Sequence, residues 1–244
     1  MAEKFYKTEK FQQIFYAVLY FLLAVAFVCT GVFVFKSQYY TNIYVSGSSM
    51  MPTLIGNTSN RVHYGISDKH QTALRNLDRF DVVITYYPWN IPEGETDEVY
   101  KIKRVWGFPG ETISMVYNEA ESNFTYTVTE GELLKYKIVA PIVDKDVNGV
   151  TWKVCEFKTE KKTFYTALHE YRQFNVTLDR DNKEYFLMGD NWGNSTDSYS
   201  HNKPGEKRIT YGDLQGKVIM IQGTAKVDGE NLYDKKKITP MYYF

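Results

Sequence analysis

The chain has 244 residues, enough for one or two domains with a sizeable core, and its 29 basic and 29 acidic residues give a net charge of zero. That balance gives no indication of nucleic-acid binding, and two cysteines without metal-ligand spacing exclude a disulfide framework and a structural zinc site. Aromatic residues make up 16% of the chain, and this composition favours a strand-rich soluble part.

The N-terminal part contains one long apolar segment. Residues 1–13 are polar and include Lys4, Lys7 and Lys10, whereas residues 14–35 are almost wholly apolar and carry no charge. About 20 such residues cross a bilayer as a helix, and the run is longer than the apolar region of a cleaved signal peptide. A buried core helix is the alternative. We predict a single transmembrane helix over residues 14–35 in the cell membrane, with residues 1–13 cytoplasmic and the rest of the chain outside.

Strands dominate the prediction for the rest of the chain. Short β-branched and aromatic runs, bounded by Gly and Pro, predict strands at residues 43–45, 61–64, 81–87, 99–106, 185–188 and 218–222. We expect a mostly β chain in which residues 36–110 and 186–230 form an all-β core. Residues 111–185 are predicted to be an inserted β-rich cap with a short helix near residues 163–172, and residues 231–244 a solvated tail.

A serine in a tight turn follows the apolar segment. Ser48 and Ser49 lie in a Gly-containing stretch that ends at Pro52. A serine hydroxyl is a poor nucleophile until a base removes its proton. None of the four histidines has a recognisable setting for that base, although His201 lies close in sequence to Asp197.

Lysine is the other candidate base. Burial disfavours the ammonium ion, and lowering a lysine pKa from about 10.4 to about 8 requires roughly 3 kcal/mol of differential solvation. Lys101 and Lys103 share one face of the predicted strand at residues 99–106, because side chains alternate along a strand. Alternation therefore does not choose between them, and a lone lysine on a strand is more often solvated.

Three sequence boxes follow one another along the chain. Residues 47–54 read GSSMMPTL, residues 103–111 read KRVWGFPGE and residues 189–198 read GDNWGNSTDS. In order and spacing they resemble the S-M-x-P-T-L, K-R-x-x-G-x-P-G-D/E and G-D-N-x-x-x-S-x-D-S boxes of bacterial type I signal peptidases, a family of membrane-anchored Ser/Lys proteases. The D-V-V run that begins at Asp81 resembles the strand between the first two boxes, whereas residues 112–184 are not covered.

The resemblance implies a catalytic pair. Ser49, directly before Met-x-Pro, would be the nucleophile in preference to Ser48, and Lys103 the general base in preference to Lys101. The backbone N–H of Ser49 would stabilise the oxyanion, and one such donor changes a rate by roughly 10²–10³. Some members supply a second donor from a serine two positions before the nucleophile. Here that position is Gly47, so the second donor stays unassigned.

The resemblance also implies supporting residues. Ser195 would hydrogen-bond to the Lys103 amine and orient it, and Asp197 would brace the site through an ion pair, with Arg104 as a candidate partner. The wall behind the lysine would be shaped by Gly189, Asp190 and Asn191.

Two positions depart from the pattern. Many members have Arg after G-D-N and another Arg after D-S, where this chain has Trp192 and Tyr199. The ion-pair partner of Asp197 is therefore open. Eukaryotic-type members carry His where Lys103 stands, so the lysine indicates the bacterial type.

The implied activity is removal of N-terminal signal peptides from secreted preproteins after small-x-small (Ala-x-Ala) sites. The implied partners are those preproteins, the lipid bilayer and a nearby secretion translocon, with no nucleic acid, metal or cofactor. Two other functions remain open. One is a related Ser/Lys membrane protease with a specialised substrate, of the self-cleaving or pilus-maturation kind. The other is an inactive anchored β-domain that binds exported proteins.

Overall fold

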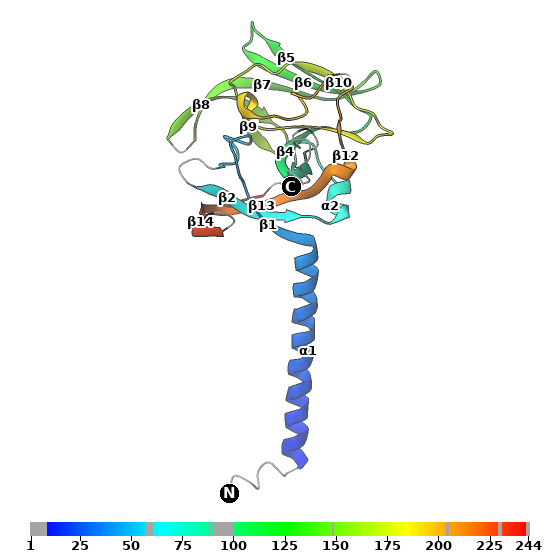
Figure 1. The fold of residues 1–244 in the computed structure, drawn as a ribbon, viewed down its shortest axis with the longest axis vertical. Helices are drawn as coiled ribbons and strands as arrows, with labels where there is room; N and C mark the ends of the chain where they lie inside the picture. The colour runs from blue at the N-terminus through cyan, green and yellow to red at the C-terminus, as the bar shows by residue number, and fades with distance from the viewer. Residues whose placement is uncertain are drawn as a thin grey trace, which may run out of the picture. The chain divides into compact units, whose positions relative to one another are not determined.

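The described part of the N-terminal unit consists mainly of one long helix. The computed structural model describes residues 9–56, 61–87, 89, 100–147, 149–203, 205–228 and 231–242, and its two compact units are Met1–Thr41 and Asn42–Phe244 (Figure 1). In the first unit, α1 (Glu9–Tyr39) contains the predicted span and is long and apolar enough to cross a membrane. None of its residues is buried, so the alternative of a core helix is not supported. Residues 1–8 lie outside the described part.

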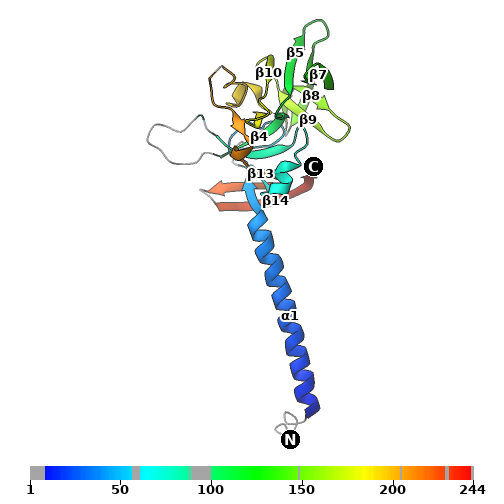
Figure 2. The ribbon, with the colours of Figure 1, turned by 90° about the vertical axis from the view of Figure 1, so that its right-hand side faces the viewer.

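The second unit contains two sheets, of which the first carries every strand predicted for the core. Its eight strands are ordered β1-β2-β13-β3-β4-β11-β12, with β14 paired to β13. The neighbouring strands β13 and β14 are labelled in Figures 1 and 2. The six predicted strands are confirmed here with shifted ends. The bounds are β1 (Tyr40–Tyr44), β2 (Val62–Asp68), β3 (Val82–Tyr86), β4 (Tyr100–Gly107), β11 (Glu184–Met188), β12 (Ile209–Thr210), β13 (Leu214–Asp228) and β14 (Asn231–Tyr242). Among the described residues, the short helices are α2 (Gln71–Arg75), η2 (Trp192–Asn194) and η3 (Tyr211–Asp213).

The second sheet is antiparallel and lies wholly within the inserted segment, which confirms its β-rich character. Its order is β10-β5-β6-β7-β8-β9. The bounds are β5 (Thr112–Asn118), β6 (Asn123–Glu130), β7 (Leu133–Val147), β8 (Val150–Lys158), β9 (Thr163–Ala167) and β10 (Phe174–Thr177).

Two predictions for local structure were wrong. The short helix expected near residues 163–172 is replaced by β9, in which Phe164 pairs with Phe157 of β8 and the two rings stack at 5.2 Å between centroids. Aromatic and β-branched residues favour such cross-strand pairs. Residues 231–242 form β14 instead of a solvated tail, because Ile238 packs against the cluster around Ile221 while the neighbouring lysines stay exposed.

An aromatic core joins the two sheets. Trp106 of β4 lies edge-on to Phe157 of β8, with 5.0 Å between ring centroids, and Phe80 packs on Phe164 at 4.8 Å. All four side chains are at most 3% exposed. Burying one large apolar side chain contributes about 1.5–3 kcal/mol, so this cluster binds the inserted segment firmly to the rest. The insertion accordingly belongs to the same compact unit as the predicted core.

Candidate active site

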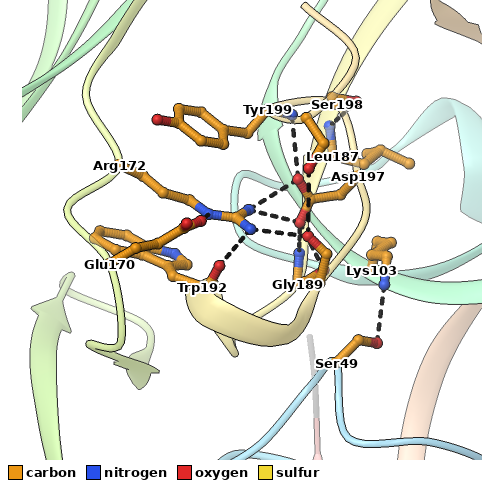
Figure 3. Close-up of polar contacts among 12 residues, drawn as sticks. Ser49, Lys103, Glu170, Arg172, Leu187, Gly189, Trp192, Asp197, Ser198 and Tyr199 are labelled. Carbon is orange, nitrogen blue, oxygen red and sulfur yellow. Dashed lines mark hydrogen bonds and ion pairs between the residues drawn. The ribbon is translucent and has the colours of Figure 1, made fainter.

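Ser49 and Lys103 meet in the second unit. Ser49 lies in the turn after β1 and Lys103 in β4, and their side chains are hydrogen-bonded at 2.8 Å between Oγ and Nζ (Figure 3). Burial along β4 begins at Lys103, which is 1% exposed, whereas Lys101 on the same face is only partly buried. The structure therefore separates the two lysines that alternation alone left equivalent.

Burial sets the charge state of this lysine. Desolvation lowers the pKa of Lys103 to about 8, and Lys101 and Arg172 push it the same way. Asp197 and Asp190 act in the opposite direction, because nearby carboxylates favour the ammonium form. An amine with this pKa is largely neutral above pH 8. It can then take a proton from a hydroxyl at hydrogen-bond distance.

The turn after β11 holds the serine loop by hydrogen bonds. The Asn191 backbone N–H donates to the Ser49 carbonyl at 2.9 Å, and the Asn191 side chain donates to the Ser48 carbonyl at 3.0 Å. The Asn194 side chain donates to the Ser48 hydroxyl at 2.7 Å. The first and third sequence boxes are thus joined directly.

Gly189 stands where no side chain fits. A Cβ at this position would lie 2.3 Å from the Ser49 carbonyl oxygen and 2.3 Å from Ser195 Oγ, closer than real atoms approach. Its backbone N–H donates to Asp197 at 2.9 Å. The glycine therefore allows the turn after β11 to approach the serine loop closely.

Ser195 does not make the contact that the resemblance implied. Its hydroxyl donates to Asp197 Oδ2 at 2.6 Å, and among the described residues the Lys103 amine is hydrogen-bonded to Ser49 and not to Ser195. The Ser195 hydroxyl donates to Asp197 and not to Lys103 because a carboxylate is a stronger hydrogen-bond acceptor than a neutral amine.

Arg104, the candidate ion-pair partner for Asp197, is paired with Asp190 instead. Arg104 binds Asp190 through two parallel hydrogen bonds of 2.7 and 2.5 Å, and both side chains are at most 1% exposed. The reason is register: Arg104 pairs with Met188 across β4 and β11, which brings Asp190, two residues further on, beside the guanidinium. A third bond, to the Phe80 carbonyl at 2.8 Å, uses another arginine nitrogen.

Asp197 is paired instead with an arginine that the sequence analysis missed. Arg172, in the connection between β9 and β10, donates from one nitrogen to both Asp197 oxygens at 2.8 Å (Figure 3). It lies outside the three boxes, at the end of the stretch for which a short helix was predicted. The available signal was indirect: Tyr199 stands where an arginine was expected, and its ring lies 4.8 Å from the Arg172 guanidinium carbon.

The other departure is accommodated by packing. Trp192 is fully buried in the aromatic core, edge-on to Phe124 of the inserted segment with 5.2 Å between ring centroids. An arginine here would have to be charged inside an apolar cluster, which is costly without a partner. An apolar tryptophan at this position therefore packs well against the apolar side chains of the inserted segment that cover it.

The histidine that lay close to Asp197 in sequence does not form an acid–base pair with it. The His201 ring stacks on Trp89 at 4.4 Å, and its Nδ1 faces Glu206 at 3.9 Å. Within the described ranges, no group of three His, Cys, Asp or Glu side chains is placed to hold a metal ion. The candidate base next to a serine is Lys103, whose Nζ lies 2.8 Å from Ser49 Oγ.

One family model matches most of the chain. The model of the family described as "Signal peptidase, peptidase S26" matches residues 13–222, a range that contains all three boxes. No curated protein matches the chain.

Proposed function

The chain belongs to the signal peptidase family, peptidase S26, and from this we propose that it is a type I signal peptidase whose catalytic residues are Ser49 and Lys103. Family membership makes it a serine peptidase with preprotein substrates. The observation that carries the assignment of residues is the 2.8 Å hydrogen bond between Ser49 Oγ and a lysine that is 1% exposed. The bond cut is the one after a small-x-small motif, with Ala-x-Ala preferred.

The pair would act in two steps. The neutral Lys103 amine takes the Ser49 proton as Oγ attacks the carbonyl carbon of the scissile bond, and the Ser49 backbone N–H stabilises the oxyanion. The ammonium then gives its proton to the leaving amine, which leaves an acyl-enzyme. In the second step Lys103 takes a proton from water, and the resulting hydroxide attacks the ester carbonyl carbon. The Lys103 ammonium then returns this proton to Ser49 Oγ as the acid product leaves. The scheme uses no cofactor.

We assign the parts of the chain as follows. Residues 14–35 anchor the protein in the cell membrane, with residues 1–13 cytoplasmic, because lysines precede the apolar segment. Residues 36–110 and 186–230 form the extracytoplasmic catalytic core, and residues 111–185 are inserted into it. Signal peptides leave the bilayer outside the cell, so an anchored site near the secretion translocon would meet them as they emerge.

Cleavage of a preprotein with an Ala-x-Ala site tests the function. In detergent, the wild-type protein is expected to cut after the final Ala, and Ser49→Ala is expected to be inactive because the nucleophile is gone. Ser46→Ala, which changes an exposed serine of the same segment, is the matched control and should cut like wild type. A substrate with Phe in place of the final Ala should resist. An inactive wild type would favour an anchored binding domain, and cleavage by Ser49→Ala would refute the nucleophile.

The pH dependence of cleavage tests the base. Lys103 must be neutral to act, so kcat/KM is expected to fall about tenfold per pH unit below the lysine pKa, which burial lowers to about 8, and to level off above it. Rates measured from pH 6 to 10 on the same substrate give this limb. A limb centred near the ordinary histidine pKa of about 6.5 would instead indicate a histidine base.

A further inference from the structure

A buried arginine of the inserted segment is bonded to the turn after β11. Arg172 donates to both carboxylate oxygens of Asp197, to the Ser195 carbonyl at 2.8 Å and to the Trp192 carbonyl at 2.5 Å (Figure 3). Only its Nε points elsewhere, to the half-exposed Glu170 at 2.8 Å. Four of its five hydrogen bonds therefore end on one short turn.

Asp197 is the centre of that turn. Its carboxylate is fully buried and accepts hydrogen bonds from the Gly189 backbone at 2.9 Å, the Ser195 hydroxyl at 2.6 Å and the Tyr199 backbone at 3.1 Å. Arg172 is the cation paired with this carboxylate among the described residues. Without it, the carboxylate would be a buried charge with no counter-ion, which destabilises whatever conformation buries it.

The same turn reaches the nucleophile. Two residues after Gly189, the Asn191 backbone donates to the Ser49 carbonyl, and the close approach at Gly189 sets the distance between turn and serine loop. A continuous set of contacts thus runs from Arg172 through Asp197 to the loop that carries Ser49.

We propose that Arg172 is a positioning residue of the active site, supplied by the inserted segment to hold Asp197 and the turn against the catalytic pair. This inference rests on the function proposed above and extends it, because it gives residues 111–185 a part in forming the site itself.

The charges around the base give the inference a distinctive signature. Lys103 is faced by Asp197 and Asp190, which raise its pKa, and by Lys101 and Arg172, which lower it. Arg104, the next residue along β4, is bound to Asp190. Loss of the Arg172 charge would leave Asp197 uncompensated and raise the pKa of Lys103. Cleavage would then require a higher pH.

The test is the pH profile of Arg172→Gln in the full chain. We expect kcat on the Ala-x-Ala preprotein to fall on the order of 10–100-fold, as misplacement of catalytic groups does, with KM nearly unchanged. The acid limb of kcat/KM should move to higher pH. Adding Tyr199→Arg to this variant should restore much of kcat and bring the acid limb of kcat/KM back to its wild-type pH, because position 199 lies against both Arg172 and Asp197.

Arg180→Gln is the matched control, because Arg180 is an exposed arginine of the same segment, paired with Glu130 at the surface. It should behave like wild type. A folded Arg172→Gln variant with wild-type kcat and an acid limb at the wild-type pH would overturn the inference.

If Arg172→Gln does not fold, Arg172→Gln/Asp197→Asn removes both buried charges and is expected to fold with reduced kcat. Wild-type kcat in that variant would equally overturn the inference. Inactivity of the wild type and the control together would mean that the proposed function fails, and the inference with it.

Discussion

Replacing Lys103 with Met is expected to reduce cleavage on the order of 10³–10⁴-fold and, at pH 7, to increase the free energy of unfolding by roughly 3 kcal/mol. The loss of activity follows from removal of the proposed base, whose amine is hydrogen-bonded to Ser49. The gain in stability follows from burial, which lowers the lysine pKa from 10.5 to about 8. Below that pKa the folded protein carries a desolvated ammonium, and Met fills a similar volume without the charge.

The sign of the pH dependence distinguishes this explanation from a general packing effect. Between about pH 8 and 10.5 the unfolded chain binds a proton at Lys103 that the folded chain does not, so wild-type stability rises with pH over that window. The advantage of the Met variant should therefore be complete below pH 8 and disappear by about pH 10.5. Denaturant unfolding in detergent at pH 7 and 10, followed by fluorescence of the buried Trp106 and Trp192, measures it.

Lys101→Met is the control for both quantities. It lies on the same face of β4 but is only partly buried, so its removal relieves little desolvation and leaves the base in place. Lower stability of Lys103→Met at pH 7, or cleavage close to wild type, would contradict the assignment of Lys103 as a buried base.

Asp190→Asn is expected to destabilise the protein by about 3–5 kcal/mol, because it leaves the Arg104 guanidinium buried without its counter-ion. The remaining partners, the Phe80 carbonyl and the face of the Phe164 ring 4.2 Å away, do not neutralise the charge. Activity should fall with stability, since the same turn continues into Asn191. Thermal and denaturant unfolding of the variant in detergent measure the effect.

Two further variants identify the cause. Arg104→Met/Asp190→Leu replaces both charges with apolar side chains and should recover most of the lost stability, as buried ion pairs commonly allow. Glu130→Gln, at the exposed pair with Arg180, should change stability little, because surface pairs are screened by solvent. If Asp190→Asn were as mild as Glu130→Gln, the buried pair would have no special role.

The strands of the core were predictable because their signals are local. Runs such as residues 81–87 combine β-branched and aromatic residues and end at proline, and the structure contains a strand at each such position. The inserted segment was harder, because residues 163–172 mix aromatic and polar types without a clear period. There β9 forms through its pairing with β8, a tertiary contact that no local signal reveals.

The candidate site was predictable as far as its sequence boxes reach. The resemblance selected Ser49 and Lys103 as candidates, in preference to Ser48 and Lys101. Strand alternation could not separate the two lysines, because their burial depends on how neighbouring strands cover each end of β4. The ion pairs depend on register and on the path of the inserted segment. For that reason Arg104 took Asp190 as its partner and Asp197 took a residue from far outside the boxes.

The position of β13 in the first sheet restricts the order in which the protein can fold. This strand lies between β2 and β3 and also pairs with β14, although it begins only at Leu214. The early strands β2 and β3 therefore cannot join into one sheet until β13, one of the last strands to be synthesised, is available between them. Pairing between strands so far apart in the sequence is slow. During synthesis the serine loop and β4, which carries Lys103, are made early. They lack the strand that joins them in one sheet, so proteolytic activity would arise only when nearly the whole chain has been synthesised.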